Sequence, residues 1–554
     1  MATEVETAMP QVKWTNAREV ELRGPARDMQ GEGHARWFER VGLWAPALLL
    51  CVSSLLLVVV YLGTPVANGN RGLTNLTESY GALERVALWQ QAFDWIPGIG
   101  QSAGDFALAP GIIAWSARLG IVGMCLAQAW VFWLAWCDMT RSLLTWLLPP
   151  IVAQVLMIGL VPSNADIFFY EMTGDLAANG INPYAHSLME FPNHPLLPFN
   201  HWIEMTAVYG PVWTSINAAM MSITGPDPIA ATIAYKIFFG VVAIGLSVLV
   251  YWFVRYLNQR PQLACIAAIL VAWQPAMILE SAGQAHNDPV MLLFSTGGIF
   301  LAIAGGTGAV RGGVILTSLS ALVKYVTLPV LALLALTRLS DRRRPGGLPR
   351  VFLAGALDVT AFVLVAFVAF FPFWNGFSTI TEMLAEPGRL YTNPIWFDIY
   401  LLLDWLFPHS VADAWSNTTR LLLQLVSIVI IGVVIVRFAL FCWRQAVSQH
   451  DAVQRLPVWT RPLLLSWTII LTTLALLPVN SHPWYWTWPI VPIATLIAFD
   501  AGGRQRPTGD TSMPPTPGPT DITPCVQSPL RWFWAYLVLT CIMTLAYHTR
   551  IVHL

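Results

Sequence analysis

The sequence has very little charge. Only 11% of its 554 residues are Asp, Glu, Lys or Arg, whereas soluble globular domains carry about 25%. Hydrophobic residues make up 56% of the chain, and apolar runs of about 17 residues or more recur along its whole length. This composition excludes an ordinary soluble enzyme and predicts an all-α polytopic integral membrane protein.

The motifs of several kinds of chemistry are also missing. The chain has no G-x-G-x-x-G or G-x-x-x-x-G-K-[ST] loop before a helix, no basic tail and no zinc-ligand spacing. Its 7 cysteines are scattered without a C-x-x-C pair, which fits small buried side chains. We therefore expect no nucleic-acid partner, no metal and no cofactor.

Hydropathy predicts about 11 full membrane spans. They are expected at 43–63, 111–137, 143–161, 229–254, 262–279, 289–306, 351–374, 421–441, 462–478, 484–500 and 531–549. A polar cytoplasmic tail, 1–42, precedes the transmembrane core, 43–500. A Pro/Thr-rich segment within 501–530 has the composition of a disordered cytoplasmic linker. It separates the core from a last helix in 531–554, which we expect to be peripheral.

Basic residues predict the orientation, because Lys and Arg in short loops favour the cytoplasm. They predict a cytoplasmic N-terminus in the plasma membrane and place the loops 162–207, 280–288 and 375–420 outside. Arg311 and Arg338 are then both inside, so the apolar segment 312–337 must enter the membrane and return as two half-helices. The same reasoning makes 208–224 re-entrant. Broken backbone at this depth needs protein or a wet cavity around it, so we expect a cavity open to the outside.

The loop 162–207 opens with carboxylates and contains no Lys or Arg. Asp166 and Tyr170 share one helical face. A carboxylate at the edge of a cavity can accept a proton from an alcohol, although S-N-A-D could also simply cap a helix. Glu171 is ambiguous, and Asn182-Pro183-Tyr184 predicts a turn.

Two further motifs lie next to predicted outer segments. Tyr209-Gly210-Pro211 is an ordinary way to begin a helix. Asp288 precedes a proline and could be a cap as well, whereas the adjacent His286 is harder to explain in that way. Asn287 completes this group of three adjacent polar side chains.

Lys324 lies in the middle of an apolar segment and is followed by Tyr325. An ionisable residue at membrane depth is costly and indicates function, usually with an anionic partner. The alternative is a side chain that extends to the interface. Arg389 and His482 are weaker candidates, and the tryptophans that follow His482 also fit an interfacial aromatic belt.

The order of these motifs resembles the polytopic glycosyltransferases of the C fold. An outward Asp, then G-I-N-P-Y, Y-G-P, H-N-D, Lys-Tyr and H-P-W-Y is most similar to the bacterial polyprenol-phosphate-mannose-dependent α-(1→6)-mannosyltransferases. The resemblance covers about residues 43–500. The carboxylate of that family often lies in the first external loop, whereas Asp166 lies in the second.

The resemblance implies a GT-C-like enzyme that transfers a hexose, with mannose as the first candidate. The donor would be a polyprenyl-phosphate sugar, and the acceptor a hydroxyl of a glycan or glycolipid on the outer face, with inversion at the anomeric carbon. Asp166 would be the general base. The implied donor-binding residues are Lys324, Tyr325, His286, Asn287, Asp288, Arg389 and His482. The residues expected to shape the acceptor side are Tyr170, Glu171, Asn182, Tyr184 and Tyr209.

Two other functions stay open. A transporter or flippase of lipid-linked sugars would also place a charge in a broken helix, but it often has repeated halves, and no repeat is evident. A lipid-linked glycan polymerase or ligase would use Arg and His, rather than Asp, as its main residues.

Overall fold

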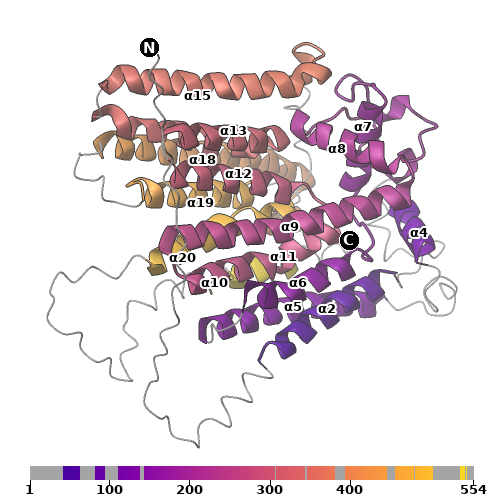
Figure 1. Cartoon of the computed structure of the whole chain (residues 1–554). Coiled ribbons are helices and arrows are strands. Elements are labelled where there is room, and N and C mark those ends of the chain that lie inside the picture. Colours follow the sequence, from indigo (N-terminus) through magenta and orange to yellow (C-terminus); the bar gives the residue numbers. More distant parts are fainter. Residues whose placement is uncertain are drawn as a thin grey trace, which may run out of the picture. The chain divides into compact units, whose positions relative to one another are not determined.

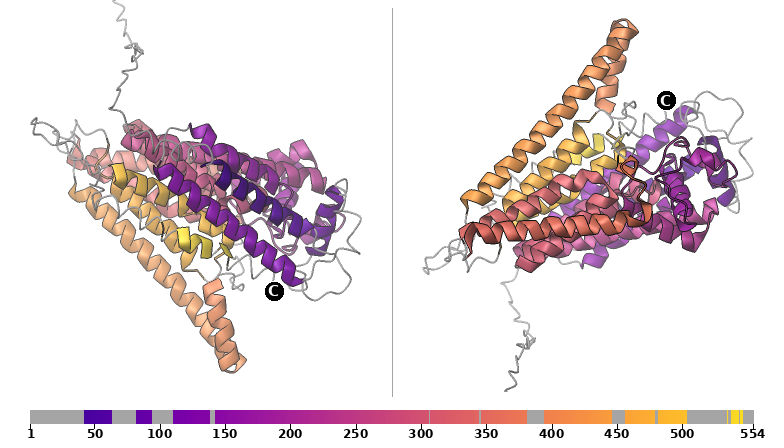
Figure 2. Two further views of the ribbon diagram at one scale, coloured as in Figure 1. Left: turned by 90° about the horizontal axis from the view of Figure 1, so that it is seen from below. Right: turned by 90° about the horizontal axis from the view of Figure 1, so that it is seen from above.

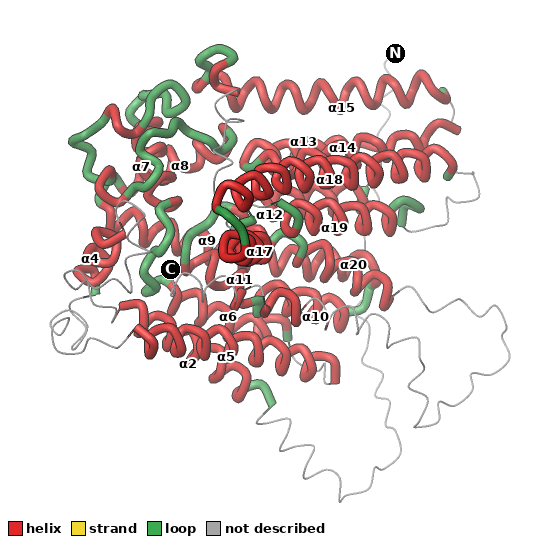
Figure 3. The backbone as a smooth tube through the Cα atoms, turned by 180° about the vertical axis from the view of Figure 1, so that it is seen from behind, coloured by secondary structure: helices red, strands yellow, loops and turns green. Residues whose placement is uncertain are grey.

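The computed structural model describes residues 42–62, 82–93, 110–137, 142–305, 307–343, 346–380, 394–445, 456–478 and 481–502, and parts of 534–545. Over these ranges the chain is helical, and its only β feature is an isolated bridge between Asn375 and Phe377 (Figure 3). The chain divides into a short unit, Met1–Trp44, and a large unit, Ala45–Leu554, which contains nearly all of the described residues. Most of the predicted tail and linker, and Arg389, lie outside the described ranges.

Long apolar helices agree with the predicted polytopic membrane protein. Those that can cross a bilayer, within the described ranges, are α2 (Trp44–Leu62), α5 (Pro110–Cys137), α9 (Pro228–Asn258), α15 (Gly347–Phe370) and α18 (His409–Arg444). Shorter apolar helices are α6 (Leu143–Met157), α12 (Asp288–Ala304), α13 (Thr307–Val323) and α19 (Thr460–Leu476). All of them coincide with predicted apolar segments, whereas the predicted total of full spans stays a prediction.

One further predicted span is sharply bent. α10 (Pro261–Ala272) and the following α11 (Pro275–Ile278) with its π-turn η3 (Leu279–Gly283) form an angle of 58°. Pro275 lacks a backbone donor and cannot continue the hydrogen-bond ladder of α10, which explains the break. The bend turns η3 toward the segment that carries His286.

The predicted reversal of 312–337 is confirmed. α12 and α13 pack along each other, and α14 (Leu328–Leu336) returns to η5 (Thr337–Arg343). Arg311 and Arg338 meet at Asp358 of α15, with Nε–carboxylate distances of 3.6 and 2.7 Å. Lys324 lies at the opposite end of α13, about 20 Å from Arg311 along the helix axis. The outward arm is therefore longer than the half-helix that was expected.

One helix of the loop 162–207 and the helix that follows this loop gather at one end of α9 and α13 (Figure 1). α7 (Asp166–Ala178) packs along α8 (Pro211–Thr224), and we call residues 163–224 the α7–α8 cap. Gly210 approaches the backbone of Leu322 so closely that any Cβ would collide with its carbonyl. Tyr235 of α9 donates to Asn217 Oδ1 at 3.2 Å. These contacts fix the cap on the helices; the predicted entry of 208–224 into the bilayer stays a prediction.

The remaining helices close the core or face outward. α20 (Ile490–Gly502) follows the short turn η8 (Pro483–Thr487) and packs on α10 and α19. α15 and α18 have mostly exposed apolar side chains, as expected of lipid-facing helices. Figure 2 shows the N-terminal end of α18 diverging, with α17 (Pro394–Leu406), from α19 and α20. In the last predicted span, Trp534 packs on Phe132 of α5 with ring centroids 5.7 Å apart.

Candidate active site

Asp166 begins α7, after the N-cap residue Ala165. Asn164 Oδ1 accepts the Asp166 amide at 3.0 Å, so Asn164 satisfies this end of the helix. The Asp166 carboxylate is only 7% exposed and lies where the helix dipole favours a negative charge. Capping therefore does not account for this side chain.

Two aromatic side chains donate to Asp166. Tyr209 Oη lies 3.0 Å from Oδ2, and Trp202 Nε1 lies 3.3 Å from Oδ1. Burial, followed by the nearby Asp166 charge, raises the pKa of Tyr209 well above its ordinary value. The Tyr209 hydroxyl therefore keeps its proton and remains a donor. The Tyr-Gly-Pro motif, which looked like an ordinary helix start, contributes directly to the site.

His286 lies between two carboxylates. Its Nε2 is 3.8 Å from Asp166 Oδ2, and its Nδ1 is 2.9 Å from Glu280 Oε2. The ring stacks on Trp484, with centroids 3.7 Å apart. His286 and Glu280 are only 1% and 2% exposed. A buried imidazole therefore lies between two acidic side chains, one of which is Asp166.

Lys324 has the anionic partner that the sequence predicted. Its Nζ donates to Asp288 Oδ1 at 2.8 Å, and Trp488 Nε1 donates to the same oxygen at 2.5 Å. The ammonium also lies 4.7 Å from the centroid of Tyr485 and 5.2 Å from that of Trp488. Asp288 makes no side-chain cap hydrogen bond at the start of α12. The carboxylate serves the buried cation instead.

Tyr209 connects the two halves of the site. Its hydroxyl donates to Asp166, and its ring centroid lies 5.9 Å from Lys324 Nζ. A candidate base and a buried cation therefore both face one aromatic side chain. The amide of Asn287, next to His286, is fully buried, and neither of its side-chain polar atoms has a hydrogen-bond partner. It is a further polar group beside the site.

The predicted N-P-Y turn is confirmed. Asn182 Oδ1 accepts the Tyr184 amide at 3.0 Å, and Asn182 Nδ2 donates to Phe373 O at 2.9 Å. The Tyr184 hydroxyl donates to Tyr209 O at 2.7 Å. The turn therefore supports the backbone of Tyr209. Tyr325 packs into the apolar cluster of Tyr184 and Phe373, so its predicted role in binding the donor stays a prediction.

Tyr170 and Glu171 occupy the buried side of the cap. The ring of Tyr170 makes edge contacts with Tyr209 and Trp213, both with centroids 5.1 Å apart. Glu171 is fully buried and accepts a hydrogen bond from Thr232 Oγ1 at 2.7 Å. Burial raises the pKa of Glu171 well above its ordinary value, which favours the neutral form of this carboxyl group. Both residues support the cap from behind.

His482 is not one of the available cations. Its ring stacks on Trp484, with centroids 4.4 Å apart. Burial, then the charge of Lys324 and the neighbouring His286, lower the pKa of His482 to about 3. At neutral pH this imidazole can offer a hydrogen bond but no charge.

Two residues of the site were missed in the sequence. Glu280 lay at the edge of a predicted span, and only the bend after α10 brings it to His286. Lys236 is a single cation in the apolar run 229–254, which was itself a signal of function. Its Nζ donates to Leu160 O at 2.7 Å and Gly283 O at 2.5 Å, and is fully buried. Lys236 therefore fixes the segment before Asp166 to the segment before His286.

Comparison with known proteins finds a similar family. The family model described as "Alpha-(1->6)-mannopyranosyltransferase, N-terminal domain" matches residues 103–340. That range includes Asp166, Tyr209, His286, Asp288 and Lys324. The chain resembles this family. The predicted similarity is thereby confirmed.

Three relatives are similar over parts of the chain that range from 29% to 65% of its length. α-(1→6)-Mannopyranosyltransferase A of Mycobacterium tuberculosis is 25% identical over 65% of this chain and 65% of its own length. α-(1→6)-Mannopyranosyltransferase B of Corynebacterium glutamicum is 25% identical over 60% of this chain and 55% of its own length. The A enzyme of the same organism is 28% identical over 29% of this chain and 32% of its own length. The chain thus aligns with less than two thirds of each of these relatives, and no solved structure matches it.

Proposed function

We propose that the protein is a membrane glycosyltransferase that transfers mannose from a polyprenyl-phosphate donor to a hydroxyl of a glycan or glycolipid, with inversion. The observation that carries the proposal is the placement of Tyr209, which bonds Asp166 and also faces Lys324. Sugar transfer from a phosphate needs a base on the acceptor side and a positive charge on the leaving-group side. The similarity to named mannopyranosyltransferases supports mannose as the sugar.

Asp166 takes the acceptor proton in this proposal. The acceptor oxygen then forms a bond to the anomeric carbon while the bond from that carbon to the phosphate oxygen breaks. Tyr209 and Trp202 hold the two carboxylate oxygens in place. His286 lies beside the base, 3.8 Å from Asp166, and its other ring nitrogen faces Glu280 at 2.9 Å.

Lys324 stabilises the departing polyprenyl phosphate. A lysine ammonium has three donors, and one of them is used by Asp288. The aromatic rings of Tyr485 and Trp488 limit water around the charge, which strengthens its interaction with an anion. No cofactor or metal is part of this scheme, because the donor carries its own activated phosphate. The outer face of the plasma membrane is the proposed location.

The direct test is transfer by membranes that contain the protein. Radiolabelled polyprenyl-phosphate mannose should give a labelled glycan or glycolipid with an α-(1→6) linkage. Polyprenyl-phosphate glucose and a nucleotide-linked mannose are the matched donors, and both should give much less product. Movement of labelled lipid across the membrane without any labelled product would favour the transporter or flippase instead. Growth of a lipid-linked glycan by whole blocks would favour the polymerase or ligase.

A further inference from the structure

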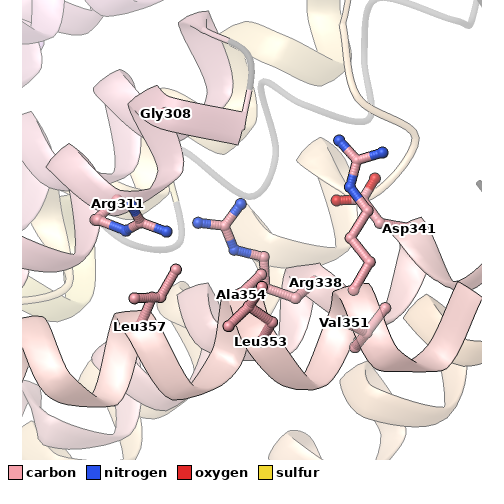
Figure 4. Close-up of a pocket in the computed structure, with 9 residues that line it drawn as sticks. Gly308, Arg311, Arg338, Asp341, Val351, Leu353, Ala354 and Leu357 are labelled. Carbon is pink, nitrogen blue, oxygen red and sulfur yellow. The ribbon is translucent and has the colours of Figure 1, made fainter. Parts of the chain in front are cut away.

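A second charged site lies at the far end of α13 from Lys324. Gly308 and Arg311 of α13 and Arg338 and Asp341 of η5 surround a cavity of about 260 Å³. The remaining lining residues come from α15: Arg350, Val351, Leu353, Ala354 and Leu357. We call these nine residues the basic pocket. Figure 4 shows the guanidinium groups of Arg311 and Arg338 converging above α15.

The basic pocket carries more positive than negative charge. Arg338 donates to both oxygens of Asp358, at 2.7 and 3.0 Å, and is almost fully buried. Arg311 approaches the same carboxylate only at 3.6 Å, and its side chain is 40% exposed. With Arg350 and Asp341, the group has three guanidiniums for two carboxylates. The nine residues of the basic pocket and the adjoining Asp358 together therefore have a formal charge of +1, which favours an anion.

One wall of the basic pocket is apolar and continuous with the lipid-facing surface. Leu353 and Leu357 of α15 are 62% and 41% exposed. Only 11% of the most apolar 18-residue stretch of this helix is buried inside the protein. A ligand of this pocket would therefore touch guanidinium groups at one end and hydrocarbon at the other. Free phosphate would use only the first of these surfaces.

The size of the cavity limits the ligand to a headgroup. Sites that enclose a whole drug-sized molecule measure roughly 300–1,000 Å³, more than the 260 Å³ found here. A phosphate and its glycerol fit such a space, while acyl chains must lie outside it. Basic pockets between helices at the cytoplasmic side are a common form of anionic-lipid site. The basic run at 338–350 predicts that side for this end of the helices.

We propose that the basic pocket binds the headgroup phosphate of an anionic phospholipid whose acyl chain lies along α15. Arg311 and Arg350 contact the phosphate, and Arg338 is held in position by Asp358. Leu353 and Leu357 provide the surface for the chain. The lipid would join α13, η5 and α15, and this site is independent of the proposed transfer reaction.

The test measures lipid retention on the purified full-length protein in detergent. Phosphatidylglycerol and phosphatidylcholine are added in equal amounts, and bound lipid is counted by native mass spectrometry. The native protein should retain phosphatidylglycerol at least tenfold more than phosphatidylcholine. Arg311→Gln combined with Arg350→Gln should remove that preference, while Arg255→Gln, in another basic loop, should keep it. Arg311 and Arg350 are exposed enough for the double variant to fold. A native-like melting temperature of the variant in phosphatidylcholine should show that it does.

A competing anion separates a lipid site from a simple phosphate site. Millimolar inorganic phosphate should leave the phosphatidylglycerol bound, because it lacks the chain that contacts Leu353 and Leu357. Displacement of the lipid by inorganic phosphate would overturn the proposal, and so would an unchanged lipid preference in the double variant. Sugar transfer by the same variant should persist, since the pocket lies at the opposite end of α13 from Lys324.

Discussion

Replacing Lys236 by methionine should damage both stability and catalysis. The ammonium donates to Leu160 O and Gly283 O at 2.7 and 2.5 Å, and more weakly to Ala282 O at 3.3 Å. The first two carbonyls belong to segments that lead to Asp166 and to His286. A cation suits such chain ends, where backbone carbonyls lack helical partners.

The magnitude follows from the two short bonds. Each buried acceptor left without a partner costs about 1–3 kcal/mol, so Lys236→Met should lower the free energy of unfolding by about 2–6 kcal/mol. Relief of the buried charge offsets part of this loss, which favours the lower half of the range. A shift of Asp166 against His286 by about 1 Å would reduce kcat by about 10²-fold.

The assay pairs thermal unfolding in detergent with the rate of mannosyl transfer. Ile237→Met is the matched control, because Ile237 is the next residue of α9 and is 48% exposed. The control should keep the native melting temperature and rate. A Lys236→Met variant that melts and transfers like the native protein would refute the structural role given to this lysine.

Three further predictions concern the Lys324–Asp288 pair, Glu171 and His482. Lys324→Met with Asp288→Asn, which removes the buried pair together, should lower kcat/KM for the lipid donor by about 10²–10³-fold, and unchanged donor kinetics would make Lys324 structural. Glu171→Gln should stabilise the protein at neutral pH relative to the native chain. Because the folded state raises the pKa of Glu171, the native protein has its full stability below the ordinary pKa of a glutamate and loses stability as the pH rises toward the raised pKa. The melting temperatures of the two proteins should therefore diverge between pH 4 and 8. Parallel curves would contradict this prediction. The native protein should lose stability as the pH falls from about 6.5 toward 3, since burial lowers the pKa of the His482 imidazole to about 3. His482→Asn should reduce this loss of stability. An equal loss of stability at acid pH in the variant would count against the prediction.

The positions of the apolar helices could be predicted because hydropathy reports directly which segments leave water. The return of the chain between Arg311 and Arg338 could also be predicted, since charge bias places both residues on one side, whereas their shared contact with Asp358 could not. The grouping of Asp166, His286 and Lys324 followed from that orientation. In each case the prediction used a property of a whole segment, either its hydropathy or the bias of its basic residues.

The partners of these residues could not be predicted. Lys236 stands out as a single cation in an apolar run, but hydropathy does not say which backbone carbonyls it binds. Glu280 reaches His286 only through the 58° bend before η3. Tyr209 looked like part of a common helix start. Its hydrogen bond to Asp166 depends on how the chain before α8 folds back onto α7. Such contacts belong to tertiary packing rather than to local sequence.

The most direct test of the account is mannosyl transfer by Asp166→Asn compared with Asp175→Asn. Both carboxylates lie in α7, and Asp175 is engaged by His194 Nε2 at 3.0 Å, away from the proposed chemistry. With radiolabelled polyprenyl-phosphate mannose, Asp166→Asn should insert and fold normally but lose at least about 10²-fold in rate, as expected when a general base is removed. Asp175→Asn should retain most of the activity. Native-like transfer by Asp166→Asn would contradict the central claim that Asp166 is the base.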